Sequence, residues 1–478
     1  MKGIFRFIII ALIATLGLAM VGVLYLFFIP NATLFGIDYI SLNKVYRSQA
    51  YNAEKIETID LSSRAYEVRI VPTDSKNISV KIYANTLGFV KKKYSEVKLD
   101  ATITGSVLDM NVSEPHGFAW KNDSYIELYL PQTKSYNLTL NNASSKTYLT
   151  SAKLKVKEFE YTTNTGNLYL ENLEISQGID LNLSKAKCYM EGNVKLNNND
   201  IELSMSAGDL VAPKCSFKNV TVNKNKGGTI EIKSCEIFTA KVNAGGRYSV
   251  GTADIVNIVS EDTNVNIGTI TKGCSITLTK SGKVEVTNVN CPAASIETDT
   301  GSIKVKNANE AIRLKSIEGD IVVNNATKLV TAENEYGNID ITFKSDLDSY
   351  TKDTTYRSVD LKNYNGKVSV HGVDNIKLKI SNKGRANIEM NNVLKASTIS
   401  GNIGDISVVI NKDAKFNLSA TGTTGSINVN FLEFEQSGGY TEDSIPDIVQ
   451  INGGSSENSL TITNKKGDIK VLDTVLAS

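Results

Sequence analysis

Short runs of alternating apolar and polar residues recur along the chain from Tyr161 onward, each introduced by a glycine. In Ile303–Val305 two apolar residues flank a lysine, and the same alternation returns at Ile312–Leu314 and at Ile321–Val323. A period of two is typical of a β-strand that buries one face. The pattern therefore predicts short, half-buried strands, and no amphipathic helical pattern lies between them.

These strands form a repeat. The copies TGSIKV at Gly301, EGDIVV at Gly319 and YGNIDI at Gly337 follow one another at intervals of 18 residues. A fixed period of about this length is typical of stacked, solenoid-like folds, in which each unit pairs its strands in parallel with the next. Glycine is expected to supply a positive φ at each turn, and the Asp, Asn or Ser after it to cap the turn. We therefore expect an all-β chain, a parallel β-solenoid with coils of about 18–21 residues.

The N-terminus predicts a membrane anchor. Phe7–Ile29 runs for 23 residues without a charge, and a helix of that length spans ~35 Å, enough for a bilayer core. The apolar core of a cleaved signal peptide is usually shorter, about 7–15 residues, so an uncleaved anchor is favoured. Lys2 and Arg6 precede the span and the next basic residue is Lys44. By the positive-inside rule the N-terminus is cytoplasmic and the rest of this single-pass protein lies outside the cell membrane.

The rest of the chain can be divided into regions that differ in how regular the strand repeat is. A strand-rich but less regular region is expected to cap the solenoid on its membrane-proximal side, and two polar segments are expected to loop out of it. The predicted parts are 1–30 (cytoplasmic tip and transmembrane anchor), 31–53 (stalk), 54–151 (membrane-proximal β region) and 152–478 (β-solenoid), with insertions at 342–363 and 432–459.

An odd number of cysteines follows the anchor, which leaves at least one thiol without an intramolecular partner. The intervals between the second and third and between the fourth and fifth are close to the repeat length, so each pair is expected in adjacent coils. Buried thiols stacked in the repeat are favoured over disulfides, which stay open as an alternative. The sequence has no CxxC or Cys/His cluster, so a zinc site is not expected. The cysteines are Cys188, Cys215, Cys235, Cys274 and Cys291.

Composition limits the chemistry. The 52 basic and 51 acidic residues leave a formal charge of +1, which gives no electrostatic footprint for nucleic acid. His116 and His371 are the two histidines of the sequence, so imidazole catalysis has little to draw on. The Gly-Asp turns lack the dense nonapeptide rhythm of calcium-binding repeats. We therefore predict no catalytic residue, no cofactor and no metal site, and the sequence leaves any ligand-binding residues open.

One group of charged residues deserves comparison with an enzyme site. Parallel β-helices host glycosidases and lyases, which need two or three carboxylates, or a carboxylate with a basic residue, on one face. Charged residues that alternate outward along strands more often form a solvated face, and that interpretation is favoured. The group consists of Arg313, Glu318, Asp320, Glu335 and Asp340.

The stretch IDLSSRAYEVRIVPTDSKNISV resembles the opening of the "putative adhesin" family of prokaryotic surface proteins, a domain of unknown function. The resemblance rests on the strands Ile59–Leu61, Val68–Ile70 and Ile78–Val80, with Pro72 between the last two. It extends from about Glu57 to Val471 through Pro131 and the Gly-Asp turns, although several turns carry Asn, Ser, Lys or Arg instead of Asp. The resemblance implies a β-rich, envelope-exposed domain without established enzyme activity.

Together these observations favour a membrane-anchored, surface-exposed, adhesin-like β-solenoid that acts as a binding or structural module without catalysis. Its partner would be a cell-wall polymer, or a polymer or protein on a host or neighbouring surface. An extracytoplasmic sensor of envelope stress is the first alternative, and a carbohydrate-active β-helix enzyme is the second. The ligand and the oligomeric state stay open at this point.

Overall fold

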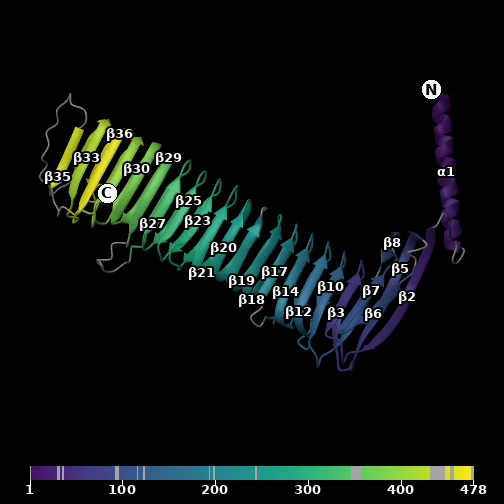
Figure 1. Cartoon of the computed structure of the whole chain (residues 1–478). Coiled ribbons are helices and arrows are strands. Elements are labelled where there is room, and N and C mark those ends of the chain that lie inside the picture. Colours follow the sequence, from purple (N-terminus) through teal and green to yellow (C-terminus); the bar gives the residue numbers. More distant parts are fainter. Residues whose placement is uncertain are drawn as a thin grey trace. The chain divides into compact units, whose positions relative to one another are not determined.

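The structure is a computed structural model. It describes residues 2–28, 33–34, 37–91, 96–115, 117–121, 124–192, 194–196, 200–242, 245–345, 357–430, 447–452 and 457–474. After one apolar helix, α1 (Lys2–Phe28), the described residues are mostly β and form a solenoid of about 13 turns with coils of about 20 residues (Figure 1). The predicted fold class is therefore confirmed. The chain divides into two compact units, Met1–Cys215 and Ser216–Ser478.

In unit 1 the strands form two sheets that share an apolar interior. The first sheet runs, in order of pairing, through β2 (Ile37–Asn52), β5 (Asn77–Lys91), β9 (Tyr125–Pro131), β4 (Glu67–Thr73), β11 (Thr147–Leu149), β13 (Leu168–Glu171), β15 (Lys187–Glu191) and the start of β18 (Asp209–Asn225). β1 (Thr33–Leu34) pairs with β2, and β8 (Gly117–Lys121) pairs with β5.

The second sheet of unit 1 has the same construction. It runs through β6 (Lys98–Thr104), β7 (Val107–Ser113), β3 (Thr58–Ser63), β10 (Tyr136–Asn142), β12 (Lys155–Thr163), β14 (Glu174–Leu183) and β17 (Asp200–Met205), with β16 (Lys195–Leu196) also beside β14. In both sheets the first strands pair antiparallel, and the pairings become parallel from β7 and β9 onward. Parallel pairing of successive coils is what the repeat predicts.

Alternation along each strand separates core from surface. In β13, Leu168 and Leu170 are 0% and 1% exposed, while Tyr169 between them points outward and is partly exposed. Leu168 lies opposite Cys188 in the next coil, so buried residues stack on buried residues. A single repeat cannot bury these side chains by itself. Their burial in an interior shared by neighbouring coils is therefore the main contribution to stability.

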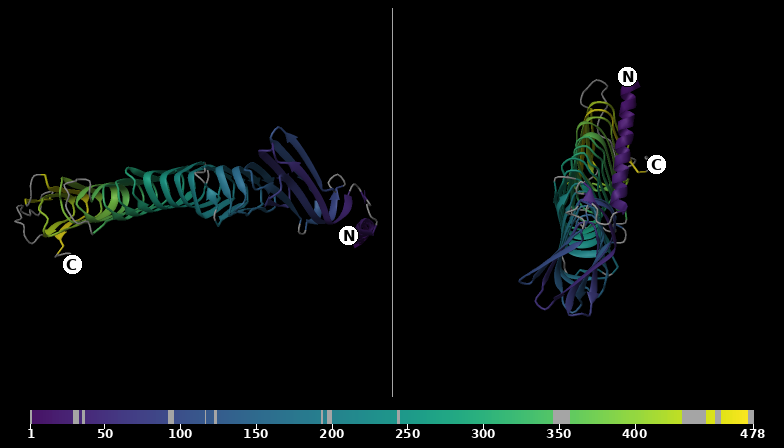
Figure 2. Two further views of the ribbon diagram at one scale, coloured as in Figure 1. Left: turned by 90° about the horizontal axis from the view of Figure 1, so that it is seen from below. Right: turned by 90° about the vertical axis from the view of Figure 1, so that its right-hand side faces the viewer.

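Unit 2 continues the two-sheet pattern. Ile303 lies opposite Ile321, 18 residues further along, and Ile321 lies opposite Ile339. Figure 2 shows the coils of this unit, in teal to yellow, stacked one on the next. The long strands that contribute to both sheets are β19 (Thr229–Val242), β20 (Gly246–Ser260), β21 (Thr263–Leu278), β29 (Ser358–Val373) and β30 (Asn375–Met390). Between them one sheet contains β22 (Val284–Val289), β24 (Ile303–Ala308), β26 (Ile321–Ala326) and β28 (Ile339–Phe343), and the other contains β23 (Ala294–Thr298), β25 (Ile312–Ser316) and β27 (Val330–Asn334).

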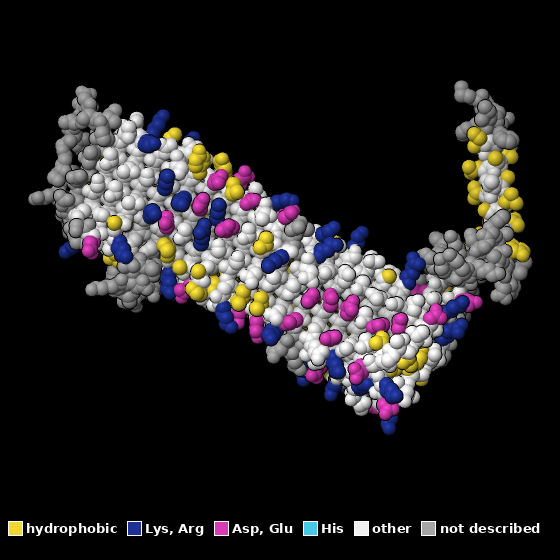
Figure 3. Space-filling view, in the orientation of Figure 1, with side chains coloured by type: hydrophobic (Ala, Val, Ile, Leu, Met, Phe, Trp, Pro, Cys, Tyr) yellow, Lys and Arg dark blue, Asp and Glu magenta, His cyan; other side chains and the backbone are white. Residues whose placement is uncertain are grey.

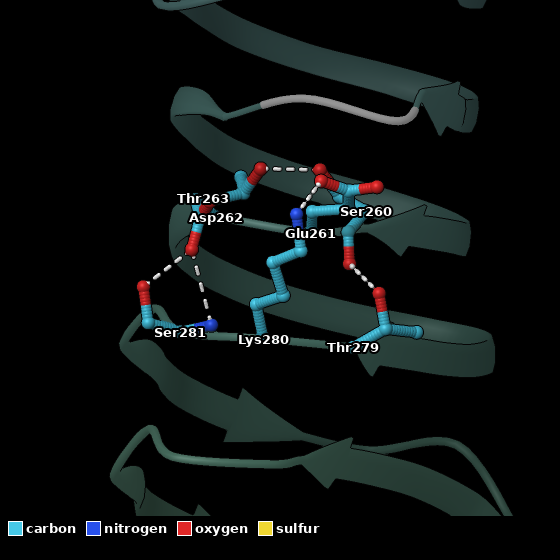
Figure 4. Close-up of polar contacts among 7 residues, drawn as sticks. All are labelled: Ser260, Glu261, Asp262, Thr263, Thr279, Lys280 and Ser281. Atoms are coloured by element: carbon cyan, nitrogen blue, oxygen red, sulfur yellow. Dashed lines mark hydrogen bonds and ion pairs between the residues drawn. The ribbon is translucent and has the colours of Figure 1, made fainter.

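Polar residues at the turns connect one coil to the next. Figure 4 shows the turn between β20 and β21 with the matching turn one coil later. The carboxylate of Asp262 accepts hydrogen bonds from the backbone N–H of Ser281 at 3.2 Å and from its hydroxyl at 2.5 Å. Beside them, Nζ of Lys280 lies 2.5 Å from Oε2 of Glu261. The turns therefore form ladders of their own alongside the sheets.

The last coil does not follow the order of the chain. β36 (Ser459–Lys466) pairs in parallel with both β31 (Ser397–Ile403) and β33 (Asn417–Thr424). In the same coil, β37 (Ile469–Asp473) pairs with both β32 (Ile406–Ile410) and β34 (Ile427–Asn430). The final coil is thus inserted between two coils that precede it in sequence, and β35 (Asp447–Asn452) lies antiparallel on the far side of β33.

The N-terminal helix has the length and composition of a membrane span. Within the described residues it is the one helix that qualifies, with a window at Ile8–Tyr25 whose mean hydropathy is 2.6 and whose side chains pack against nothing. Residues 346–356, 431–446 and 453–456 lie outside the described part of the chain. The predicted insertions at 342–363 and 432–459 overlap these gaps, and they stay predictions, as do the other predicted domain bounds.

Candidate tyrosine-rich binding site

Three tyrosines form a ladder on the outer face of the first sheet of unit 1. Tyr148, Tyr169 and Tyr189 lie opposite one another in β11, β13 and β15. The ring centroids are 4.8 Å apart for the first pair and 5.2 Å apart for the second, and the rings are within 10° and 11° of parallel. Because the rings stack on each other, each orders its neighbour, and each side chain stays partly exposed.

A cluster of aromatic and charged side chains continues this ladder toward β9. Arg69 lies opposite Tyr148 in the register of β4 and β11. Its guanidinium is 4.2 Å from the ring centroid of Tyr125, which stacks on Tyr83 at 4.5 Å. Nε of Arg69 is 2.6 Å from Oε1 of Glu67. Burial acts to lower the pKa of Arg69, but the hydrogen bond and charge of Glu67 outweigh it and raise the pKa, so this cation is firmly charged.

A cavity of about 630 Å³ opens beside the cluster. The residues that line it include Glu67, Arg69, Tyr125, Lys146 and Asn167. Its volume falls in the range of about 300–1,000 Å³ that is usual for small-molecule sites. We call this cavity with Tyr148, Tyr169 and Tyr189 the tyrosine site. It combines aromatic rings, two cations, a carboxylate and an amide that lie on the first sheet or at the turns that lead into β11 and β13.

The lining does not provide the groups that hydrolytic chemistry requires. Glu67 is the one carboxylate among the described residues of the cavity, and it is paired with Arg69. Glycoside hydrolysis generally uses two carboxylates about 5–10 Å apart. Within the described residues, no group of three or more His, Cys, Asp or Glu side chains is arranged to hold a metal ion. The side chains of the site offer aromatic ring edges and hydrogen-bonding groups, which are suited to ligand recognition.

Two members of the charged group singled out from the sequence, Arg313 and Asp340, lie in different sheets, whereas Glu318, Asp320 and Glu335 lie at the turns that follow β25 and β27. Arg313 points outward from β25 in one sheet of unit 2, and Asp340 points outward from β28 in the other. Asp320 has a structural task, because its Oδ1 accepts hydrogen bonds from the backbone N–H of Asn338 at 2.9 Å and from its side-chain amide at 3.1 Å.

His371 and the five cysteines are not among the residues of the tyrosine site. Nδ1 of His371 lies 3.1 Å from Oε2 of Glu389 in unit 2, and His116 is outside the described residues. All five cysteines are free and buried. Burial raises the pKa of Cys215 to about 11 and that of Cys235 and Cys274 to about 12. These thiols are therefore protonated, poorly nucleophilic core side chains.

An acidic column occupies the outer face of the second sheet of unit 1. Glu160, Asp180 and Glu202 lie in register, and Glu158 and Asp200 flank them. Figure 3 shows acidic side chains gathered over β12 and β14. Burial and the charge of Glu202 raise the pKa of Asp180. This column marks one face of the unit as anionic, in contrast to the mixed charges around the tyrosine site.

The sequence carried a signal for the tyrosine site that the repeat search did not use. Tyr148, Tyr169 and Tyr189 are separated by intervals of 21 and 20 residues, which match the coil length. A search for aromatic residues at the repeat period would have placed them on one column. The contribution of Arg69 and Tyr125 had no such signal, because it depends on how β4 and β9 pair.

Comparison with known proteins shows the family. The family described as Toastrack DUF4097 matches residues 56–279 and 250–362, which together cover 56–362 of the 478 residues. Among solved structures, a "putative cell adhesion protein" from Clostridium sporogenes is 9% identical, with a TM-score of 0.15, and the match covers 90% of this chain and 100% of that chain. A "putative adhesin" from Bacteroides fragilis is 12% identical, with a TM-score of 0.25, and the match covers 59% of this chain and 99% of that chain. No curated protein matches the chain.

The family match covers the strands at Ile59–Leu61 and Val68–Ile70 and the Gly-Asp turn at Gly319, and it ends at residue 362, before the last part of the resemblance up to Val471. That resemblance is therefore confirmed. The chain belongs to the Toastrack DUF4097 family of β-solenoid domains.

Proposed function

We propose that this protein is a membrane-anchored, non-catalytic binding module that holds a cell-surface polysaccharide at the tyrosine site. The observation that carries the proposal is the ordered ladder of Tyr148, Tyr169 and Tyr189 beside a polar cavity. Tyrosine provides a large amphipathic contact area at a small cost in conformational entropy. Because stacking has already ordered these rings, a ligand does not need to order them again on binding.

The geometry favours an extended polymer over a compact ligand. The rings face one another, so they offer a ligand their edges at a spacing of 4.8 to 5.2 Å from coil to coil. A chain with regularly spaced hydroxyl groups can repeat the same contact on each rung. Next to the ladder, Arg69, Lys146 and Asn167 can donate hydrogen bonds to hydroxyl or carboxylate groups of one sugar unit in the cavity.

Two further features support the module as a surface protein. The span at Ile8–Tyr25 is long and apolar enough to anchor the chain, and the basic residues Lys2 and Arg6 favour a cytoplasmic N-terminus. The absence of a second carboxylate from the described cavity lining supports binding without turnover.

A polysaccharide array probed with full-length protein in detergent tests this proposal. The array carries chitin, cellulose and polygalacturonate, which separate neutral from acidic polymers. We expect binding to at least one polymer, and a loss of roughly three- to tenfold in affinity for Tyr169→Ala and for Arg69→Ala. The control is Tyr336→Ala, which removes a 59% exposed tyrosine from unit 2 and is expected to bind normally. Equal binding by all four proteins would exclude the tyrosine site.

A further inference from the structure

β6 forms an open edge of the second sheet of unit 1. It pairs antiparallel with β7 along all seven residues, from Lys98 opposite Ser113 to Thr104 opposite Val107. Within the described part of the chain, β7 is the one strand that pairs with β6. The backbone N–H and C=O groups on its other side therefore face no strand among the described residues, and such an edge is a template for another strand.

The apolar interior of unit 1 continues onto this edge strand. Leu99, Ala101 and Ile103 lie directly opposite Val112, Met110 and Leu108 of β7, so they share its inward face. The three residues of β7 are at most 3% exposed, whereas Ile103 is 53% exposed. The apolar surface thus extends to the last strand, where Leu99 and Ala101 are partly exposed and Ile103 is more than half exposed. Apolar surface exposed at an edge is typical of interaction surfaces.

The usual defences of an edge strand are weak in β6. Natural edges are protected by proline, bulges, inward-pointing charges or lysines. The sequence KLDATIT contains no proline, its pairing with β7 has no bulge, and its inward positions are apolar. Its one lysine, Lys98, is at the first position and lies 3.3 Å from Glu96. The strand is therefore competent to pair with a further strand.

Two copies of β6 can pair with each other in antiparallel orientation, with complementary side chains opposite one another. With a two-fold axis at Ala101, Leu99 of one copy lies opposite Ile103 of the other, which buries both apolar side chains. Asp100 then lies opposite Thr102, so no like charges face each other directly. Shifting the axis to Asp100 would place two aspartates opposite one another, which is unfavourable. The register at Ala101 also pairs all seven residues.

We propose that a second copy of this chain pairs with β6 in antiparallel register about Ala101 and joins the second sheets of two molecules. A seven-residue strand pair buries less than the ~1,200 Å² of a stable standard interface, so the dimer is weak in dilute solution and forms when molecules are concentrated in one membrane. The pairing does not depend on the polysaccharide proposal. If both hold, two tyrosine sites in one assembly give avidity for a polymer.

Site-specific crosslinking of the full-length protein in lipid vesicles tests the pairing. In Ala101→Cys the two introduced thiols lie directly opposite, at a Cα separation of ~4.5–5.5 Å that a disulfide tolerates. The five native thiols are buried, so they do not compete. In the matched variant Thr104→Cys, the two thiols are separated along the strands by about 20 Å and should not join. Copper–phenanthroline is the oxidant, and dimer is measured on a non-reducing gel.

We expect a disulfide-linked dimer for Ala101→Cys and at least a fivefold lower yield for Thr104→Cys. Adding Ile103→Asp to Ala101→Cys places a charge opposite Leu99 and should reduce the dimer to the level of Thr104→Cys. Because Ile103 is more than half exposed, this variant should fold, and an unchanged melting temperature verifies that it does. Absence of dimer from folded Ala101→Cys overturns the proposal. Equal yields at the two positions, or a yield that Ile103→Asp does not change, also overturn it.

Discussion

A Cβ atom on Gly337 would overlap the carbonyl oxygen of Gly319, the glycine at the same turn one coil earlier. The same relation joins Gly366 to Gly337 and Gly384 to Gly366. The turns of unit 2 therefore stack so closely that hydrogen is the side chain that fits. Close approach, more than backbone conformation, is the shared requirement, because Gly366 has a positive φ of 127° and Gly337 does not.

Replacing one of these glycines should therefore destabilise unit 2. We expect Gly337→Ala to lower the free energy of unfolding by about 1–3 kcal/mol, the usual cost of overpacking. In the matched control Gly273→Ala, the new methyl group would lie 3.8 Å from the side chain of Ile255, an ordinary contact. That control should be neutral or slightly stabilising. Chemical denaturation of the two variants checks the difference, and equal stabilities would contradict the stacked-turn account.

The repeat could be predicted from the sequence because its information is local. Alternation at Ile303–Val305 and a glycine every 18 residues were sufficient to predict stacked parallel coils. The hydrogen bonds at the turns were only partly predicted. The residue after each turn glycine was expected to cap its own turn, whereas Asp320 accepts a hydrogen bond from Asn338 in the next coil. The insertion of β36 and β37 between two earlier coils could not be predicted, since the KGDIKV copy that leads into β37 would fit against almost any neighbouring coil.

Removal of the inserted coil should disrupt more than its own residues. A chain that ends at Asn452 lacks β36 and β37, so β31 and β33 lose the strand that lies between them. We expect limited proteolysis to cleave this variant within residues 397–430, and a separate peptide of residues 453–478 to restore protection. Cleavage confined to residues after 430 would show that the preceding coils are stable without the inserted one.

The five cysteines should be inert in the folded protein. Burial raises the pKa of Cys235 and Cys274 to about 12, so almost no thiolate exists at pH 8. We expect Ellman's reagent to detect less than one thiol in the native protein and five after denaturation. A disulfide would reduce the second number by two, and a fast-reacting native thiol would contradict the buried environment.

The acidic column should make stability depend on pH in a defined direction. Because burial and Glu202 raise the pKa of Asp180, the native state retains this proton above the ordinary value of 3.8, where the unfolded chain has lost it. Stability therefore falls as pH rises through that window. We expect Asp180→Asn to be more stable than the wild type at pH 7, by about 0.2–1 kcal/mol, and to lose this advantage below pH 3.8.

Asp262 provides the matched control with the opposite sign. The hydrogen bond from Ser281 lowers the pKa of Asp262, so its contribution to stability is present above the ordinary pKa of 3.8 and is lost as pH falls through the lowered value. Asp262→Asn should therefore melt at a lower temperature than the wild type at pH 7. Thermal unfolding of both variants at pH 7 and pH 3 measures the contrast. Shifts of the same sign at pH 7 would contradict the assigned environments.

We propose that the tyrosine site holds a polymer without cutting it, and co-sedimentation with an insoluble polysaccharide measures both properties in one experiment. Full-length wild type, Tyr169→Ala and the control Tyr336→Ala are mixed with the polysaccharide, and the bound protein and the length of the polymer chains are measured over time. We expect saturable binding by the wild type and the control, weaker binding by Tyr169→Ala, and unchanged polymer length. Shortened polymer, or equal binding by Tyr169→Ala, would contradict the proposal.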